Sequence, residues 1–366
     1  LEIDNVVLHT VPMGGSFGRK RYNDFVIETA WIAQVYFQRK FRDQLIEKKN
    51  HKVKVQLVWT REDDLAREHY RPASVQRLDW NGQQRNQIQH TLCESGAPAH
   101  TMSVAAGAQF DFLDWNIPST GKVVAGDFLP AIWRGVAHGY FSFAICSFMD
   151  ELSYCHDEDP IAFFSRHIRQ LSVVERLKLS INAGTRYQPD RLLKVVENVK
   201  RASNWKLVQR QNKAMGFAAY PCFGSYIAIV VDITLKEGIL SVSEAWAAVD
   251  CGIAVNPNGI RAQIEGGIMY GLSACLSSEI SNNPDNASPN FDSYIVARMQ
   301  DAPIIHVSIE ESQRHPTGVG ELGVAAIGPA VANAVRRATN MRFVSFPLLK
   351  QSRLNLENAI QVNELV

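Results

Sequence analysis

A glycine-rich turn that carries a single carboxylate constrains this chain more than any other stretch. Residues 316–323 read Pro-Thr-Gly-Val-Gly-Glu-Leu-Gly, and the small residues that follow predict a helix with Pro329 near its start. Glycines let a backbone approach a ligand closely, and a helix N-terminus points free N–H groups at whatever precedes it. Glu321 has no basic neighbour within five positions, which is a setting for a general base beside a bulky cofactor. A helix-capping turn with a solvated glutamate is the alternative interpretation.

Length and composition limit the class of protein. The chain has 366 residues, enough for two domains, and its 46% hydrophobic and 20% charged residues are ordinary for a globular protein. The net charge of +1 does not favour a nucleic-acid partner. No apolar run approaches the roughly 18 residues of a membrane span, and no signal peptide is evident. Because the chain opens with Leu1 in a strand-like segment, the start of the gene product is expected to lie further upstream.

Six cysteines are spread along the chain without a Cys-x-x-Cys pair. This spacing argues against an iron–sulfur cluster or a structural zinc site in this chain, so no metal ligands are assigned. Disulfides stay open as an alternative. Buried free thiols are the interpretation that we prefer for Cys146, Cys251 and Cys275, because they lie in apolar sequence.

A second glycine-rich loop lies near the beginning of the chain. Residues 1–12 predict a strand, residues 23–33 predict a helix, and Gly14-Gly-Ser-Phe-Gly18 joins the two. Backbone amides in such a loop can hold an anion. The loop lacks the Gly-Lys-Ser/Thr of a Walker motif and is not Gly-x-Gly-x-x-Gly, so a tight turn without a ligand is the alternative.

The middle of the chain offers one candidate cation. Residues 54–60 predict a strand, and residues 73–130 predict strand-like pieces separated by polar loops. Trp133-Arg-Gly135 then places Arg134 between an aromatic residue and a flexible hinge. A guanidinium there suits a phosphate or an oxyanion, although a structural salt bridge explains it equally well. Helices are expected over 143–154 and from Asp159 onward.

The second half predicts an antiparallel meander followed by a helix. The strands are expected over 217–220, 224–235 and 239–249, after a basic helical segment, 185–212, that we take as the domain boundary. A helix over 260–274 carries Gln263, whose side chain is more often a surface group than a ligand contact. It also contains two glycines at i, i+4, which indicate close approach by a packed helix or a cofactor. A final strand is expected over 302–310. The pattern predicts an α+β fold with mixed and antiparallel sheets flanked by helices.

Four stretches, taken in order, resemble the molybdenum-binding subunit of the xanthine oxidase and aldehyde oxidoreductase family. They are Gly14–Arg19, Trp133–Gly135, Asp250–Pro257 with Arg261–Gly267, and Gly318–Gly323. Two further segments, 58–64 and 148–152, resemble the isoquinoline 1-oxidoreductase β-subunit branch, of which this chain would form about the C-terminal half. The resemblance implies two α/β lobes of the molybdenum hydroxylase large-subunit type. The first molybdopterin-binding lobe is expected over 1–200, and the second, with the catalytic glutamate, over 201–366.

The resemblance also implies an activity and a site. The enzyme would hydroxylate an aldehyde or an N-heteroaromatic compound with oxygen from water, and Glu321 would be the base. The cofactor would be molybdopterin, in its cytosine dinucleotide form, with molybdenum. The expected cofactor-binding residues are Gly15, Ser16, Phe17, Gly18, Arg134, Gln263 and Gly320. Arg134 is the weakest of these, because the following Val-Ala-His departs from the pattern of the purine enzymes.

Partners follow from the same resemblance. Electrons would leave through [2Fe-2S] clusters in a partner iron–sulfur subunit, and a cytochrome c subunit is a further candidate. No Gly-Gln-Gly pterin loop is found here, so another chain or segment is expected to complete the site. The branch suggests a periplasmic or periplasm-facing membrane-associated enzyme, with the cytoplasm as the alternative. The competing function is a non-catalytic scaffold subunit of an electron-transfer complex that keeps the fold without the cofactor.

Overall fold

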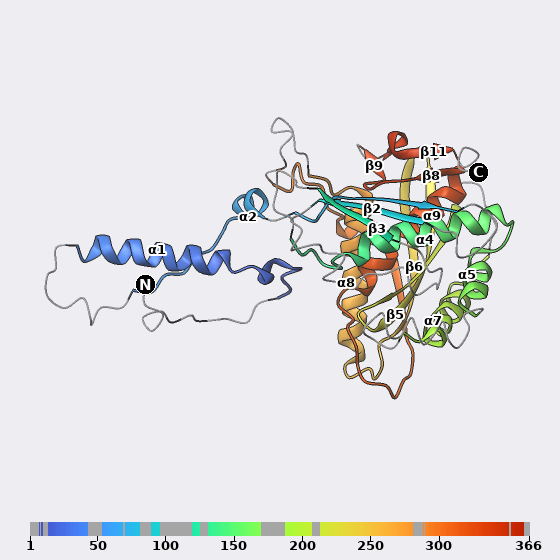
Figure 1. Cartoon of the computed structure of the whole chain (residues 1–366), viewed down its shortest axis with the longest axis horizontal. Helices are drawn as coiled ribbons and strands as arrows, with labels where there is room; N and C mark the ends of the chain where they lie inside the picture. Colours follow the sequence, from blue (N-terminus) through green and yellow to red (C-terminus); the bar gives the residue numbers. More distant parts are fainter. Residues whose placement is uncertain are drawn as a thin grey trace.

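The structure is a computed structural model, and it shows a body of sheets and helices from which one arm extends (Figure 1). It describes residues 14–42, 53–68, 70–80, 89–95, 119–124, 131–169, 187–206, 213–280, 290–350 and 353–361, with Val7, His9 and Ser288. The arm consists of the described residues between 14 and 68. The body has the expected α+β architecture, with antiparallel and mixed sheets flanked by helices.

The central sheet of the body confirms the expected meander. Its strands are β4 (Lys213–Cys222), β5 (Ser225–Lys236), β6 (Ile239–Asp250) and β7 (Ile304–Ile309), in that spatial order. The first three are antiparallel, and β7 runs parallel to β6. Glu237 and Gly238 join β5 to β6 with φ angles of 54° and 80°, as a two-residue hairpin turn requires.

Helices cover both faces of this sheet. Gly216 of β4 faces α9 (Leu322–Thr339), because a Cβ there would lie 2.0 Å from the carbonyl oxygen of Ala330. The next residue, Phe217, points to the other face, where it packs edge-on against Phe164 of α5 (Pro160–Arg169). Helix α7 (Pro189–Ala202) packs beside α5 and contacts β5 and β6. The core therefore continues through both layers.

Helix α8 (Pro257–Leu276) packs closely against α9 through glycine. The Asn256 side chain caps α8 by accepting a hydrogen bond of 3.0 Å from the Gly259 N–H. A Cβ on Gly267 would lie 3.2 Å from the Cα of Gly323, and a Cβ on Gly323 would lie 2.7 Å from the carbonyl oxygen of Ile264. The close approach that the glycines of α8 predict is therefore made by a helix. This contact sets the distance between the two elements that carry Gln263 and Glu321.

The start of α9 differs from the sequence expectation. The helix begins at Leu322, so Pro329 lies in its interior and not near its start, because small residues from 322 onward continue the helix across the proline. Asn340 ends the helix in the left-handed conformation, with φ 56°. The earlier start makes Glu321 the N-cap residue of α9.

A buried ionic cluster ties the other end of α9 to α4 (His138–Cys155). Arg336 Nε lies 2.6 Å and Arg342 Nη2 lies 3.0 Å from Asp150 Oδ2, and Arg337 bonds the other carboxylate oxygen. Burial alone would raise the pKa of Asp150. The three guanidinium charges outweigh burial and lower this pKa to about 2.

The remaining elements are shorter. A three-stranded sheet lies against α4 and contains β1 (Ser74–Asp79), β2 (Gln89–Ser95) and β3 (Ser119–Val124). The arm contains η2 (Arg19–Arg21), α1 (Asp24–Lys40) and α2 (Arg61–Arg67). The C-terminal part contains η8 (Met299–Asp301), β8 (Met341–Phe343), β9 (Leu349–Lys350), β10 (Arg353–Leu354), η9 (Leu356–Asn358) and β11 (Ala359–Gln361). None of the described helices combines the length and apolarity needed to cross a bilayer.

Other expectations have mixed outcomes. The strand expected over 1–12 lies outside the described residues, apart from two positions. The strand expected over 54–60 is wrong for the described chain, because these residues are assigned to no strand and form no ladder with any described strand. Buried free thiols are confirmed at Cys146, Cys251 and Cys275. Cys222 is also a buried free thiol, and Cys155 is an exposed one. The division into lobes at residue 200 stays a prediction.

Candidate functional site

Glu321 lies where the turn 316–320 meets α9. Although Glu321 occupies the N-cap position, its side chain makes no capping hydrogen bond. The side chain is half-buried, and burial raises the pKa of its carboxyl group, while the charge of Arg134 partly opposes this rise. Glu321 therefore does not cap the helix through its side chain, and its carboxylate is available for other chemistry.

Arg134 connects three elements at this point. Its Nε donates a hydrogen bond of 2.6 Å to the carbonyl oxygen of Gly320, and its Nη2 donates to the backbone and side-chain oxygens of Gln263, both at 3.1 Å. Burial lowers the pKa of Arg134, whereas the nearby Glu321 raises it. The guanidinium has no carboxylate within salt-bridge distance in the described part of the chain, so it acts as a hub of hydrogen bonds to neutral oxygens.

The loop around Phe17 adopts a conformation that its glycine makes possible. Phe17 has φ 51° and Gly18 has φ 120°, and a Cβ on Gly18 would lie 1.8 Å from the carbonyl oxygen of Ile132. No other residue fits at position 18 without moving the backbone. This contact brings the loop against the Trp133-Arg-Gly segment and presents the Phe17 ring, which is 49% exposed.

A stack of aromatic rings forms one wall of the site. Phe17 stacks on Tyr270 with ring centroids 4.9 Å apart, and Tyr270 stacks on Trp133 at 4.7 Å. The Arg134 guanidinium lies over the rings of Phe17 and Tyr270, and Arg71 lies over Trp133 at 4.9 Å. Such stacking aligns flat π faces and favours nearby cations. The Phe17 loop, α8 and the Trp133 segment are thus locked together.

The structure brings together most of the residues that the sequence predicts for the site. Phe17, Arg134, Gln263 and Gly320 are linked by the contacts above, and Glu321 follows Gly320 directly. Gly15 lies against the ring of Phe17, because a Cβ on Gly15 would lie 3.5 Å from Phe17 Cζ. Ser16 accepts a hydrogen bond from the Arg19 N–H, and no described contact joins Gly15 or Ser16 to Glu321. The roles of these residues stay predictions.

Sequence reasoning missed Tyr270. It lies seven residues after Gln263, so both occupy the same face of α8 two turns apart. That spacing is the signal that could have identified it. The sequence also contains no sign that Cys222, at the end of β4, lies near Glu321. Burial raises the pKa of its thiol, and the charge of Glu321 raises it further.

The site has the groups that a flat, polar and anionic cofactor needs. A Cβ on Gly14 would meet nothing within 4 Å, and a Cβ on Gly320 or Gly266 would meet only the tips of Gln263 or Arg134, at 3.9 Å. The glycines therefore leave open space beside an amide, which both donates and accepts, and a guanidinium, which donates. Among the described residues, no group of three or more His, Cys, Asp or Glu could hold a metal ion directly.

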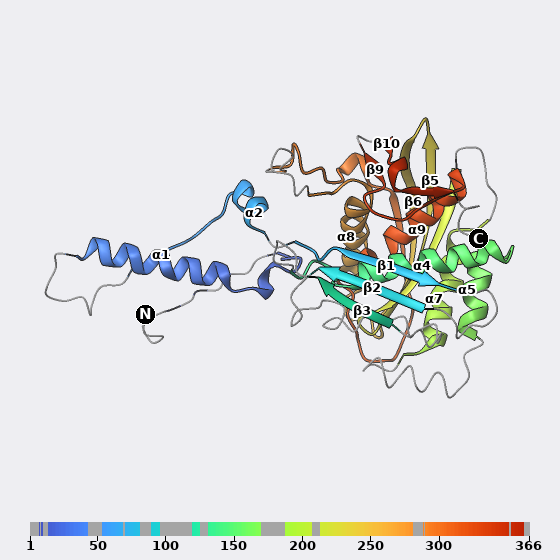
Figure 2. The same cartoon turned by 45° about the horizontal axis from the view of Figure 1, so that its top comes forward.

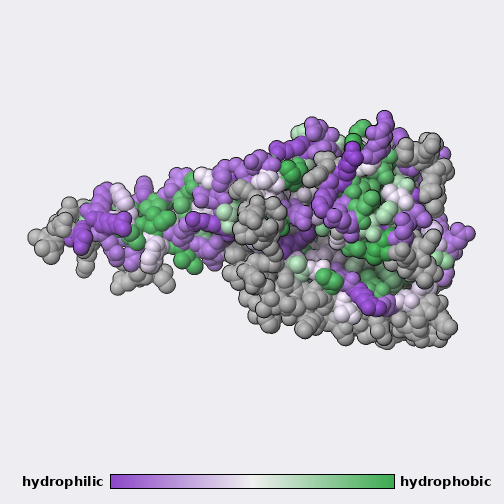
Figure 3. Space-filling model, turned by 90° about the horizontal axis from the view of Figure 1, so that it is seen from above, coloured by the Kyte–Doolittle hydropathy of each residue, from purple (hydrophilic) through white to green (hydrophobic). Residues whose placement is uncertain are grey.

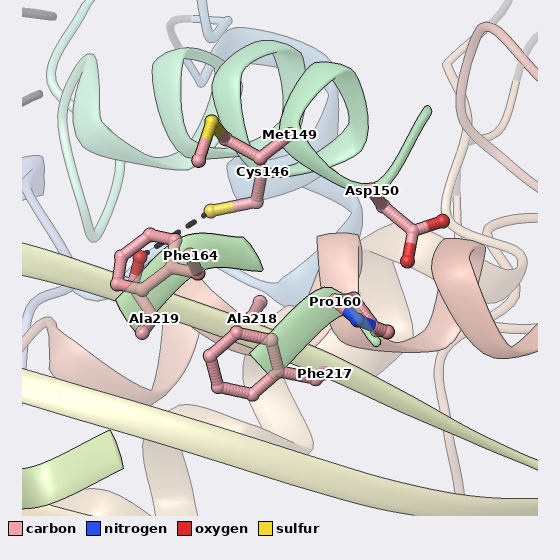
Figure 4. A pocket seen from close by; sticks show the side chains of 8 residues that line it. All are labelled: Cys146, Met149, Asp150, Pro160, Phe164, Phe217, Ala218 and Ala219. Atoms are coloured by element: carbon pink, nitrogen blue, oxygen red, sulfur yellow. Dashed lines mark hydrogen bonds between the residues drawn. The ribbon is translucent and has the colours of Figure 1, made fainter. Parts of the chain in front are cut away.

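A separate small pocket lies between α4, α5 and β4 (Figure 4). It is lined by Cys146, Met149, Asp150, Pro160, Phe164, Phe217, Ala218 and Ala219. The Cys146 thiol donates to the carbonyl oxygen of Ala219 at 3.5 Å, and burial raises its pKa to about 12, so it stays protonated. The pocket shares no residue with the Glu321 site, and Asp150 is engaged by arginines, so the pocket is a packing feature.

The chain is similar to known proteins in one segment of its sequence and in its fold. Residues 174–303 match the molybdopterin cofactor-binding domain family. The structure is similar to quinoline 2-oxidoreductase from Pseudomonas putida 86, with a TM-score of 0.64 and 11% identity over 80% of this chain and 63% of that one. This similarity shows the fold. The domain match shows that residues 174–303 resemble a molybdopterin cofactor-binding domain.

The chain is also similar to two curated proteins over most of its own length. The chain is 28% identical over 371 residues to isoquinoline 1-oxidoreductase subunit beta of Brevundimonas diminuta, covering 94% of this chain and 43% of that protein. It is 26% identical to the membrane-bound aldehyde dehydrogenase (pyrroloquinoline-quinone) of Gluconacetobacter polyoxogenes, covering 94% and 46%. The chain is thus a relative of the isoquinoline 1-oxidoreductase β subunit, and it spans about half the length of these relatives.

Proposed function

We propose that this chain is part of the molybdenum subunit of a hydroxylase that oxidises an aldehyde or an N-heteroaromatic compound with oxygen from water. The observation that carries the proposal is the position of Glu321. Its carboxylate makes no capping bond, its pKa is raised by burial, and it lies beside the Arg134 hub that joins the Phe17 loop to Gln263. A carboxylate with a raised pKa is a stronger base, as proton abstraction near neutral pH requires.

Each residue of the site has a separate task in this proposal. Molybdopterin with molybdenum, when bound, supplies the two-electron oxidation. Gln263, Arg134 and the backbone of the Phe17 loop hold the cofactor through hydrogen bonds and close glycine contacts. Glu321 takes up the proton of the attacking water-derived hydroxyl on its carboxylate. The stacked Phe17 and Tyr270 rings exclude water from this side of the site.

The same proposal extends to the rest of the assembly. We assign the cytosine dinucleotide form of the cofactor, an iron–sulfur subunit with [2Fe-2S] clusters as the electron acceptor, and a cytochrome c subunit as a further partner. The six cysteines of this chain contain no Cys-x-x-Cys pair for such clusters, which supports a separate electron-transfer chain. A location in the periplasm, or on the periplasmic side of the membrane, belongs to the same proposal.

The test is Glu321→Gln in the intact complex purified from its source. The substitution keeps the size and polarity of the side chain and removes its basicity. We expect unchanged molybdenum and pterin content, and turnover of aldehydes and N-heteroaromatics with a dye acceptor reduced about 10²- to 10⁴-fold. Full activity would contradict the role of Glu321. An intact complex without molybdenum or pterin would instead favour a non-catalytic scaffold.

A further inference from the structure

The arm of the molecule contains a helix with exposed apolar residues on more than one face. Helix α1 extends away from the body, and none of its residues is buried (Figures 1 and 2). Ile27 is 68% exposed and Trp31 is 67% exposed, one turn apart. Phe25, Ile32 and Tyr36 are also exposed. Ile32 follows Phe25 by seven residues and Tyr36 follows Ile32 by four, so the three share another face of the helix. Figure 3 shows hydrophobic patches interrupting the hydrophilic surface of the arm.

A helix with apolar residues on more than one side is normally buried. The described residues of the body do not cover α1, and exposed apolar patches of this kind mark surfaces that contact another protein or a membrane. The charged residues of α1 include Asp24 and Glu28 as well as Arg39 and Lys40, so neither sign of charge dominates. This surface therefore suits burial against apolar side chains better than attraction to a charged partner.

The segment next to α1 has the alternating pattern of a strand but is assigned to no strand. The side chains of residues 53–60 alternate between half-buried and exposed positions, with Val58 72% exposed. No described strand forms a ladder with them. The Trp59 indole N–H donates to Glu28 at 3.0 Å, which holds this segment against α1. Within the described residues, no strand pairs with the backbone N–H and C=O groups of this segment, so they offer an edge on which another strand can pair.

The arm has a defined shape, because charged residues brace it internally. Arg19 bonds Asp24 at 2.6 Å and Glu68 at 3.2 Å, and its guanidinium lies over the rings of Phe25 and Trp59. These contacts tie the start of α1, the segment 53–60 and the end of α2 to one point. That point is two residues from Phe17, so the arm originates in the loop of the candidate site.

We infer that the arm is the docking surface for the polypeptide corresponding to the part of the relatives that this chain does not span. More than half of each of the two relatives lies outside the match, which covers 43% and 46% of their lengths. Such a polypeptide pairs a strand with residues 53–60 and covers Ile27 and Trp31 with apolar side chains. Because the arm begins at the Phe17 loop, docking there brings this polypeptide against the cofactor site. The inference rests on the arm and on the lengths of the relatives, and it does not depend on the role of Glu321.

Site-specific photo-crosslinking in the source cells tests the docking surface. A benzophenone amino acid replaces Trp31 or Val58, both on the arm, or Leu356, which is 61% exposed on the body and serves as the control. After irradiation, the tagged chain is purified, and the cross-linked peptides are sequenced by mass spectrometry. We expect the two arm probes to capture peptides that align with the part of isoquinoline 1-oxidoreductase subunit beta outside the present match, in the same polypeptide or in another one. The control is expected to capture at least tenfold less of this material.

The outcomes separate the possible occupants of the arm. Cross-links to the arm of a second copy, to an unrelated protein or to lipid would overturn the inference, and so would the absence of cross-links from both arm probes. Trp31→Glu supplies an independent measurement. It is expected to reduce the yield of the assembled subunit at least tenfold, because it places a charge in an apolar interface. The matched change on the body, Leu356→Glu, is expected to leave the yield unchanged, and equal yields from the two variants would contradict the inference.

Discussion

Arg134 Nε donates a hydrogen bond of 2.6 Å to the carbonyl oxygen of Gly320, across 186 positions of sequence. Gly320 immediately precedes Glu321, so this bond fixes the backbone that carries the carboxylate. The same guanidinium contacts Gln263 and lies over Phe17. One side chain thereby sets the relative positions of the turn, the α8 helix and the glycine-rich loop.

Arg134→Met is expected to shift the pH dependence of turnover. The positive charge of Arg134 lowers the pKa of Glu321 against the effect of burial, so its removal lets this pKa rise further. Glu321 acts as a base only when ionised, and activity is lost as the pH falls through its pKa. The acidic limb of the kcat/KM profile should therefore move to higher pH, as steady-state rates between pH 5 and 9 would reveal.

Arg134→Lys is the matched control for this shift. Lysine keeps the charge but loses the planar fork that reaches Gly320 and Gln263 together. The acidic limb should stay near its original position. The value of kcat/KM should fall about 10- to 100-fold, because a hydrogen bond to a charged group contributes about 1.5–3 kcal/mol. Identical pH profiles for the methionine and lysine variants would show that the charge of Arg134 does not act on the base.

Tyr270→Ala is expected to loosen the cofactor site, whereas Tyr270→Phe is expected to preserve it. The Tyr270 ring lies between Phe17 and Trp133, and aromatic pairs contribute about 0.5–1.5 kcal/mol each beyond the area they bury. Within the described residues, its hydroxyl makes no hydrogen bond, and burial raises its pKa, so the ring is the part that matters. Molybdenum content per chain after extensive dialysis is the measurement. Equal loss from both variants would assign the effect to the hydroxyl instead.

The parts of the fold that the sequence predicts well depend on local signals. The β5–β6 hairpin follows from two apolar runs around Lys236-Glu-Gly238, whose residues 237 and 238 adopt the positive φ angles of the turn. The helix expected over 260–274 runs from Pro257 to Leu276, because Pro257 and the Asn256 cap start it three residues earlier and its last turn continues two residues further. Each of these elements is determined by residues within a few positions of one another.

The parts that the sequence does not predict depend on distant partners. Residues 54–60 have the composition of a strand, yet a strand is completed only by a neighbouring strand, and the described chain offers none. Glu321 has no basic neighbour in sequence, and the contact of Arg134 with the turn joins residues that are far apart in the chain. Tyr270 belongs to the site because α8 packs against the Phe17 loop and the Trp133 segment, a contact that the sequence does not show. Its spacing of seven residues from Gln263 places both on one face of the helix.

Gly323→Ala is expected to separate α8 from α9. A Cβ at this position would lie 2.6 Å from the backbone nitrogen of Ile268, so backbone has to move, at a cost of about 1–3 kcal/mol. Because Glu321 lies two residues away, activity should fall along with the urea midpoint. Gly139→Ala in α4 is the control, since its Cβ would meet nothing within 4 Å and alanine favours a helix. Equal stability of the two variants would contradict the close packing of these helices.

Asp150→Asn is expected to destabilise the body and to remove part of its acid sensitivity. The pKa of Asp150 in the folded chain is about 2, below the unfolded value of about 3.9, because three arginines outweigh burial. A depressed pKa contributes stability above the unfolded value, and this contribution is lost as the pH falls from about 4 toward 2, by about 2–3 kcal/mol.

The asparagine variant leaves the buried arginines without this carboxylate, which costs about 3–5 kcal/mol. Urea unfolding of the wild type and the variant at pH 7, 4 and 3 measures both effects. The two free energies should differ most at pH 7, and the difference should narrow by about 1 kcal/mol at pH 3. Glu357→Gln, which removes an exposed partner of Lys350, should change neither value measurably. A constant difference at all three pH values would show that Asp150 does not titrate against the arginine cluster, and that the end of α9 is anchored to α4 by packing alone.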